Sequence, residues 1–226
     1  MTKTTCVIGA RGGIGSALCG RLRGAPGATV IEMDRDGPIP IDISDPASIA
    51  TAFNTARAQH PQLDALVVAS GILDLGKLGN LSLETWNRVL AVNLTGPFLC
   101  SQAACSWLRD GGRIVLVGSL AGRTGGVLTG TAYAVSKGGI ETLTKSMAQE
   151  LAPRSITVNC VAPGGVDTPM ISGNPPAAID SMKAATPLRR LARADEIAAA
   201  IEYLLSDGAA YVTGSVLAVN GGLRMD

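Results

Sequence analysis

A tyrosine and a lysine stand four residues apart in Thr131-Ala-Tyr-Ala-Val-Ser-Lys137, which places Tyr133 and Lys137 on one face of a helix. A free phenol has a pKa of about 10, and bringing it to about 7 requires roughly 4 kcal/mol. An ammonium about 4 Å away supplies that order of energy at an effective dielectric constant of about 20. The spacing therefore predicts acid/base chemistry by Tyr133, with the lysine charge as its activator.

Ser119 follows the apolar run Arg113 to Gly118, which we expect to be a strand. Doubly wound sheets bind ligands at the carboxyl ends of their strands, so the Ser119 hydroxyl is expected beside Tyr133, where it can hold a carbonyl oxygen. A lone serine here would be an ordinary turn residue. Its convergence with Tyr133, Lys137 and a glycine-rich loop favours a catalytic role.

The glycine-rich loop is Gly9-x-x-x-Gly13-x-Gly15, and it joins the first predicted strand to a helix. Glycines at such a turn let backbone amides and the helix N-terminus approach a pyrophosphate. The spacing differs from the GxGxxG of other dinucleotide folds, and glycine-rich turns after strands are common. The loop therefore predicts a dinucleotide site only in combination with the other residues.

Asp34 ends the second predicted strand, nineteen residues after Gly15. A carboxylate at this position accepts hydrogen bonds from ribose hydroxyls and repels a 2′-phosphate, which predicts NAD rather than NADP. Arg11 and Arg35 would tolerate a phosphate if Asp34 pointed away. Alternatively, Asp34 simply caps the turn that follows it.

The elements that must position these residues alternate between short β-branched runs and helical patterns. This order predicts a single-domain, doubly wound parallel sheet of the Rossmann type, with helices on both faces. Helices are expected to begin near Gly13, Pro46, Leu83, Ala132 and Ala194. The predicted strands are Thr4 to Ile8, Thr29 to Met33, Leu63 to Val68, Arg113 to Gly118, Ile156 to Val161 and Ser215 to Val219.

The connection after the second strand is unusually short. Seven residues separate Asp34 from Asp42, too few for the helical crossover that a parallel strand pair normally requires. We therefore expect the helix after strand two to be missing.

Composition narrows the class of function. The 226 residues suit one domain spanning 1–226, and a net charge of +1 gives no basic field for a nucleic acid. We expect no membrane segment and a cytoplasmic location. The five cysteines are expected to be reduced core residues, and a single histidine predicts no metal site.

Two further segments carry expectations about motion and assembly. Gly, Pro and Asn gather between Pro163 and Pro176, so residues around 168–191 are predicted to form a substrate lid; an ordinary surface loop is the alternative. Gly138 and Gly139 thin the helix after Lys137, which suggests an assembly in which another helix approaches closely. The alternative is packing within the chain's own fold.

Taken together, these motifs resemble the short-chain dehydrogenase/reductase family along nearly the whole chain. Members of that family pack as dimers and tetramers, so the resemblance implies a homodimer or homotetramer. The chain departs from the family at Val68-Ala69-Ser70-Gly71, where Asn-Asn-Ala-Gly is usual. The matching segments are Gly9-x-x-x-Gly13-Ile14-Gly15, Val92-Asn93-Leu94, Ser119, Tyr133-x-x-x-Lys137, Pro163-Gly164-Gly165-Val166-Asp167-Thr168, Tyr211-Val-Thr-Gly214 and Val219-Asn220-Gly221-Gly222.

The resemblance implies a role for each matched residue. Tyr133 would be the general acid/base, Ser119 would polarise the substrate oxygen, Lys137 would also bind the nicotinamide ribose, and Asn93 would hold a relay water. Pro97 has no N–H for the carbonyl of residue 93, which would leave that carbonyl free for water; a plain helix kink is the alternative. The implied cofactor-binding residues are Gly9, Arg11, Gly13, Ile14, Gly15, Asp34, Asp42, Ile43, Ala69, Gly71, Tyr133, Lys137, Pro163, Gly164, Val166 and Thr168.

The function predicted from these residues is hydride transfer between a nicotinamide cofactor, preferably NAD, and a secondary alcohol or ketone. The small and aliphatic character of residues 170–191 points to a modest apolar substrate. One alternative is an NADPH-dependent ketone or 3-oxoacyl reductase. Another is a non-catalytic, cofactor-sensing protein of the same fold.

Overall fold

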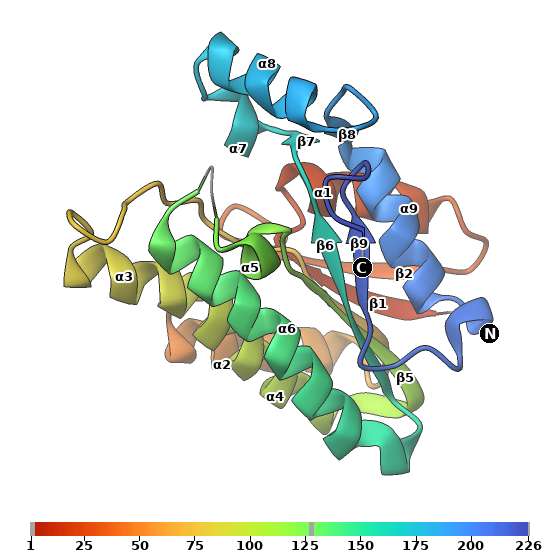
Figure 1. Ribbon diagram of the computed structural model, residues 1–226. Coiled ribbons are helices and arrows are strands. Elements are labelled where there is room, and N and C mark those ends of the chain that lie inside the picture. Colours follow the sequence, from red (N-terminus) through yellow and green to blue (C-terminus); the bar gives the residue numbers. More distant parts are fainter. Residues whose placement is uncertain (1–2, 127–128, 226) are drawn as a thin grey trace.

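Seven parallel strands form the central sheet of the computed structural model, which describes residues 3–126 and 129–225 (Figure 1). Their order is β3-β2-β1-β4-β5-β6-β9, so the chain winds outward from β1 and then returns to β4 on its other side. This confirms the doubly wound prediction and puts the switch point, where such folds bind ligands, between β1 and β4. The strands are β1 (Thr4–Ile8), β2 (Thr29–Asp34), β3 (Ile39–Pro40), β4 (Leu63–Val68), β5 (Leu108–Val117), β6 (Thr157–Pro163) and β9 (Val216–Val219).

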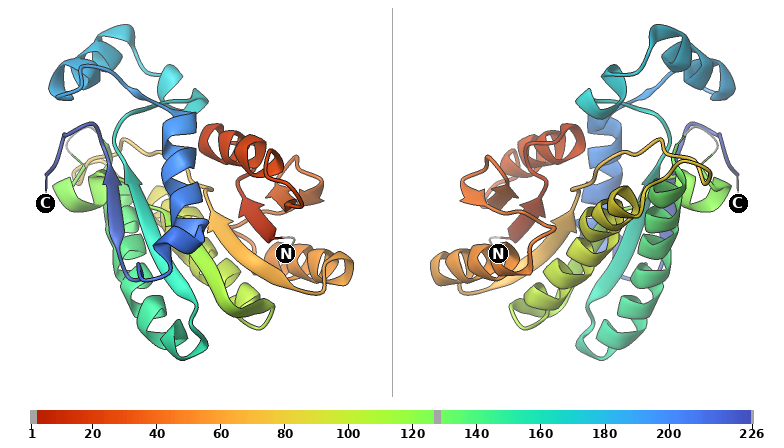
Figure 2. Two further views of the ribbon diagram at one scale, coloured as in Figure 1. Left: turned by 90° about the vertical axis from the view of Figure 1, so that its right-hand side faces the viewer. Right: turned by 90° about the vertical axis from the view of Figure 1, so that its left-hand side faces the viewer.

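Helices cover both faces of the sheet (Figure 2). One face carries α1 (Gly13–Arg23) and α9 (Ala194–Leu205); the other carries α2 (Pro46–Gln59), α4 (Gly96–Cys105) and α6 (Thr131–Leu151), with α3 (Leu83–Leu90) beside α6. The remaining elements are the π-helix η1 (Ala91–Thr95), α5 (Ala121–Thr124), α7 (Pro169–Ser172), α8 (Pro176–Ala185), the short helices η2 (Ala152–Arg154) and η3 (Asp207–Ala209), and a two-stranded sheet of β7 (Val166–Asp167) and β8 (Ala192–Arg193).

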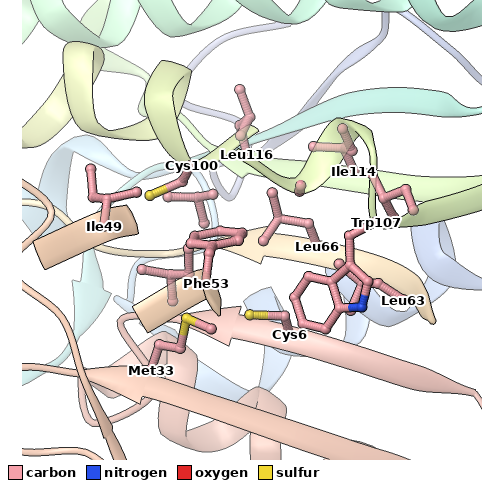
Figure 3. Close-up of a cluster of buried hydrophobic side chains, with 14 of the residues drawn as sticks. Cys6, Met33, Ile49, Phe53, Leu63, Leu66, Cys100, Trp107, Ile114 and Leu116 are labelled. Atoms are coloured by element: carbon pink, nitrogen blue, oxygen red, sulfur yellow. The ribbon is translucent and has the colours of Figure 1, made fainter. Parts of the chain in front are cut away.

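Alternating strand residues supply a separate core for each face, because successive side chains of a strand point in opposite directions. In β1, Cys6 and Ile8 join the core under α2, α4 and α6, while Val7 joins the core under α1 and α9. Figure 3 shows the first of these cores, where Phe53 of α2 meets Trp107 edge to face at 6.2 Å. The continuously apolar strands are therefore explained by burial on both sides.

The helix after β2 is absent, as predicted. A turn closed by the Gly37 amide and the Asp34 carbonyl (3.1 Å) brings the chain back at once, and the two residues of β3 pair beside Met33 and Asp34. The first helix after this turn is α2, which begins at Pro46 with its N-cap Asp45 bonded to the Ala47 amide. The carboxyl end of β2 is therefore left open at the rim of the sheet.

Several predicted boundaries were wrong. β5 begins at Leu108, five residues before the expected start, because the charged and glycine residues at 109–112 hide an irregular stretch of strand pairing. It ends at Val117, which leaves Gly118 outside the strand. Residues 168–191, predicted to be a substrate lid or an ordinary surface loop, contain α7 and α8, each opened by a proline in its first turn.

The glycines of α6 pack inside the chain, so the assembly argument built on them was wrong. A Cβ on Gly138 would lie 3.2 Å from the Gly122 carbonyl oxygen, and one on Gly139 would lie 2.8 Å from a methyl carbon of Leu94. These glycines therefore make room for α5 and η1 of the same chain rather than for a partner helix.

All five cysteines are free thiols, and four of them are buried. Burial raises the pKa of Cys100 and Cys160 to about 12, so both are neutral core groups at neutral pH. Within residues 3–126 and 129–225, none of the helices combines the length and the apolar character needed to cross a membrane.

Candidate active site

A cavity of about 100 Å³ opens at the carboxyl ends of β4, β5 and β6, beside the first turn of α1. The sequence predicted most of its lining, and the structure brings those residues together. Five lining residues were missed: Ser70, Val117, Gly118, Met170 and Ile171. The predicted residues that line it are Ile14, Ala69, Gly71, Ser119, Tyr133, Lys137, Pro163, Gly164, Val166 and Thr168.

The Tyr133 phenol, on the first turn of α6, lines the cavity together with the Ser119 hydroxyl. The Ser119 oxygen also accepts the Ala121 amide at 3.1 Å, so the first turn of α5 orients the hydroxyl. Burial raises the pKa of Tyr133, and the Ser119 hydrogen bond opposes this rise. The predicted downward shift is therefore wrong for this arrangement, because the loss of water around the phenol outweighs the stabilisation of its anion.

Lys137 is buried beside the same phenol. Its Nζ donates to the Val117 carbonyl oxygen at 2.8 Å and lies 5.8 Å from the centre of the Tyr133 ring. Burial lowers the pKa of Lys137 to about 8. The predicted i, i+4 pair is therefore present, and the ammonium is fixed by the end of β5 rather than by the phenol.

Asn93 lies one layer behind the cavity and is fully buried. Its side chain accepts the Ile72 amide and donates to the Ile72 carbonyl, both at 2.9 Å, and also donates to the Ser136 hydroxyl at 3.2 Å. Ser136 in turn donates to the Tyr133 carbonyl at 2.7 Å. Asn93 thus ties the loop after β4 to the helix that carries Tyr133.

Ser136 was not predicted from the sequence, although its spacing from Tyr133 and Lys137 could have identified it. The residue stands three positions after Tyr133 and one before Lys137, which places it on the same face of α6. A polar side chain on a buried helix face indicates that a hydrogen-bond partner lies next to it.

The structure changes the argument about Pro97. Residues Ala91–Thr95 form a π-helix, in which the Gly96 amide bonds to the Ala91 carbonyl five positions back. In that register an N–H at position 97 would bond to the Val92 carbonyl. The missing N–H of Pro97 therefore leaves the Val92 carbonyl, rather than the Asn93 carbonyl, without this donor. The π-turn itself is what loosens the helix at this point.

The glycine-rich loop is held by close backbone contacts. Gly9 has φ +83°, and a Cβ there would lie 2.6 Å from the Ser70 nitrogen; one on Gly15 would lie 2.0 Å from the Gly9 oxygen. A Cβ on Gly13 would lie 2.5 Å from the Thr168 methyl carbon, so the loop also touches the segment after β7. Only glycine permits these approaches.

The start of α1 fits an anionic group such as a pyrophosphate. No described side chain caps this helix, and its first turn contains no acidic residue. Amide groups at an uncapped helix start, together with the helix dipole, favour a negatively charged ligand.

Asp34 faces the glycine-rich loop. One carboxylate oxygen accepts the Arg11 amide at 2.8 Å, and the other accepts the Arg35 amide at 2.7 Å. The carboxylate therefore caps its own turn, which is the second of the two alternatives, and also holds the glycine-rich loop. Its contact with the ribose hydroxyls of a cofactor stays a prediction.

Asp42 and Ile43 lie outside the cavity. The Asp42 carboxylate accepts the Ser44 amide and hydroxyl, and these bonds lower its pKa. Ile43 is buried, with its carbonyl oxygen 2.4 Å from where a Cβ on Gly96 would lie. The family resemblance implies that these two residues touch the adenine ring of the cofactor, and this contact stays a prediction.

Known proteins resemble this chain over nearly its whole length. The profile of a family described as enoyl-(acyl carrier protein) reductase matches residues 19–224. The cis-4-hydroxycyclohexanecarboxylate dehydrogenase of Sinomonas cyclohexanicum is 36% identical, covering 97% of this chain and 96% of the relative. The 3-oxoacyl-(acyl-carrier-protein) reductase FabG of Escherichia coli (strain K12) is 37% identical, covering 99% and 98%.

A solved structure of the short-chain dehydrogenase/reductase from Serratia marcescens superposes with a TM-score of 0.91 at 34% identity, covering 99% of this chain and 98% of that one. With the fold and the Ser119, Tyr133 and Lys137 cluster, these similarities define a class: nicotinamide-dependent oxidoreductases that interconvert alcohols and ketones. The chain belongs to the short-chain dehydrogenase/reductase family.

Proposed function

We propose that this enzyme catalyses NAD-linked interconversion of a secondary alcohol and its ketone, with Tyr133 as the general acid/base. The observation that carries the proposal is that the Ser119 hydroxyl, the Tyr133 phenol and the Lys137 ammonium line one cavity. A hydroxyl donor and a proton-transfer group at one point are what a carbonyl/alcohol conversion needs.

The proposed roles follow from where the groups lie. When bound, a nicotinamide cofactor supplies the hydride acceptor. Ser119 holds the substrate oxygen. The Tyr133 phenol gives its proton to the ketone oxygen during reduction, and its phenolate takes the hydroxyl proton when the alcohol is oxidised. Lys137 stabilises that phenolate and binds the nicotinamide ribose, while Asn93 supports the loop after β4 and holds the relay water.

The cofactor would lie along the carboxyl edge of the sheet. We assign its pyrophosphate to the uncapped start of α1 and its nicotinamide to the side of the cavity formed by Pro163, Gly164, Val166 and Thr168. Residues 168–191 act as the lid in this proposal. Support comes from α7 and α8, which contain no buried residue and are joined to the fold through the β7 and β8 pairing.

Asp34 is the proposed determinant of cofactor choice, so NAD is expected to give the higher kcat/KM. Replacing this residue, as in Asp34→Ser, should lower kcat/KM for NAD by about 10- to 100-fold, because a charge-assisted hydrogen bond contributes about 1.5–3 kcal/mol. It should raise kcat/KM for NADP, because the repulsion of the 2′-phosphate is removed. Steady-state kinetics with both cofactors measure this ratio.

Asp36→Ser is the matched control, since Asp36 is an exposed carboxylate two residues away. It should leave the NAD to NADP ratio unchanged. A parent enzyme with higher kcat/KM for NADP would overturn the assignment. That result would favour the second candidate, an NADPH-dependent ketone or 3-oxoacyl reductase. This candidate is supported by the two exposed arginines beside Asp34 and by the similarity to FabG.

The enzyme is proposed to work as a homodimer or homotetramer in the cytoplasm. Free cysteines suit a reducing compartment. Assembly is supported by the exposed apolar side chains Phe98 of α4 and Val135 of α6, which are 43% and 46% accessible on one side of the sheet. Static light scattering should give the mass of two or four chains. A single-chain mass at micromolar concentration would rule out a stable assembly.

A further inference from the structure

The short helix that follows Ser119 touches the catalytic helix directly. A Cβ on Gly122 of α5 would lie 2.7 Å from the Gly138 nitrogen and 2.7 Å from the carbonyl carbon of Lys137. The two backbones therefore meet beside the base of the Lys137 side chain. A helix of only four residues has little rigidity of its own, so its position depends on such contacts.

An ion pair fastens this contact. The Arg123 Nε lies 3.0 and 3.2 Å from the two carboxylate oxygens of Glu141, and the two side chains are only 20% and 10% exposed. Glu141 stands one helical turn beyond Lys137 in α6. The pair thus joins α5 to the helix that carries Tyr133 and Lys137, and little water reaches it to weaken the attraction.

The same turn sets the direction of the Ser119 hydroxyl. The Ala121 amide donates to the Ser119 Oγ at 3.1 Å, and the Gly122 amide donates to the Ser119 carbonyl at 3.0 Å. The Leu120 amide donates to the Pro163 carbonyl at 2.9 Å. A rotation of α5 relative to α6 would therefore move the hydroxyl away from the Tyr133 phenol.

We propose that Arg123 and Glu141 are positioning residues for the reaction. Their ion pair holds α5 in the one orientation that keeps Ser119 against Tyr133. This inference rests on the proposed function, because the ion pair affects the reaction only through the positions of Ser119 and Tyr133. Neither residue lines the cavity, so neither is expected to touch substrate or cofactor.

A double-mutant cycle of Arg123→Gln, Glu141→Gln and the double variant tests the proposal. Each single variant should lower kcat about 10- to 100-fold, because displacement of a reacting group by about 1 Å costs up to that factor. The KM for NAD should stay within twofold of the parent. The double variant should lose no more than the worse single variant, because both changes abolish the same contact.

Asp110→Asn is the control for stability alone. It breaks the exposed Arg154 ion pair at the other end of β5, far from the cavity, so the melting temperature should fall only slightly and kcat should not change. Kinetics are read well below the melting temperature, with the folded fraction counted by cofactor binding. Single variants that bind cofactor and keep the parent's kcat would overturn the proposal.

If Arg123→Gln and Glu141→Gln do not fold, a milder substitution tests the same proposal. Arg123→Lys keeps the charge but replaces the guanidinium fork with one ammonium, and should lose about threefold in kcat. A folded Arg123→Lys enzyme with full kcat would also overturn the proposal. Tyr133→Phe run in parallel separates the two ideas: if it is inactive while Glu141→Gln is fully active, the positioning role alone fails; if it keeps turnover, the proposed function fails.

Discussion

Tyr133→Phe is expected to lower kcat by about 10² to 10⁴, the contribution usually made by general acid/base catalysis. The substitution removes one hydroxyl from a buried ring and leaves the ring's packing in place. Among the described residues, the polar side chain that acts on the phenol is Ser119, whose oxygen keeps the Ala121 amide. Cofactor affinity should therefore hardly change, and the loss should fall on kcat rather than on the KM for NAD.

Tyr211→Phe is the matched control, because the Tyr211 side chain is fully exposed. It should leave both kinetic constants unchanged. The measurement is the initial rate of cofactor reduction with any alcohol that the parent enzyme oxidises. A Tyr133→Phe enzyme within a few-fold of the parent would show that another group moves the proton.

Lys137→Met is expected to remove activity and to stabilise the fold at neutral pH. Methionine has a similar length and no charge, so the cavity wall keeps its shape. The variant loses the only cation placed over the Tyr133 ring among the described residues, so kcat should fall by at least about 10². The KM for NAD should rise as well, because the proposed ribose contact is lost.

The stability effect follows from the pKa of about 8 in the folded protein, below the ordinary value of 10.5. The unfolded chain binds more protons between these values, so the stability of the parent should rise with pH from about 8 to 10.5. Below pH 8 the buried charge lowers the free energy of unfolding of the parent by about 3 kcal/mol. The variant removes this penalty but leaves the Val117 carbonyl without its donor, which costs about 1 kcal/mol. The net gain of about 2 kcal/mol should raise the melting temperature by about 5 °C at pH 7.

Thermal melts from pH 7 to pH 10.5 measure this gain. The variant should show a flat profile where the parent's stability rises. Lys145→Met, an exposed lysine on the same helix, should show no such effect. A Lys137→Met melting temperature below that of the parent at pH 7 would mean that the ammonium stabilises the fold.

The residues of the site were predictable because their spacing is a local property. Tyr133 and Lys137 lie on one helix, and Gly9, Gly13 and Gly15 lie on one turn, so helix and loop geometry suffice to bring them together. Ser119 required only the rule that strand ends meet at one edge of a parallel sheet. The alternation of strands and helices predicted the doubly wound parallel sheet, and the seven residues between Asp34 and Asp42 predicted the missing helix after β2.

What could not be predicted depends on contacts between distant segments. The upward pKa shift of Tyr133 comes from burial by the whole fold, which spacing does not reveal. The packing of Gly138 against Gly122 joins two helices, and a glycine pattern alone does not say which neighbour it accommodates. The Arg123 and Glu141 pair is likewise formed by residues eighteen positions apart on separate helices.

The central claim is tested most directly by mixing the purified enzyme with NAD and a panel of secondary alcohols while following the absorbance of the reduced cofactor. The panel should include cis-4-hydroxycyclohexanecarboxylate and 3-hydroxyacyl esters, with the matching ketones and reduced cofactors for the reverse direction. We predict NAD reduction by at least one small apolar alcohol. An enzyme that binds NAD but turns over no alcohol or ketone with either cofactor would contradict the account and identify a cofactor-binding protein without this chemistry.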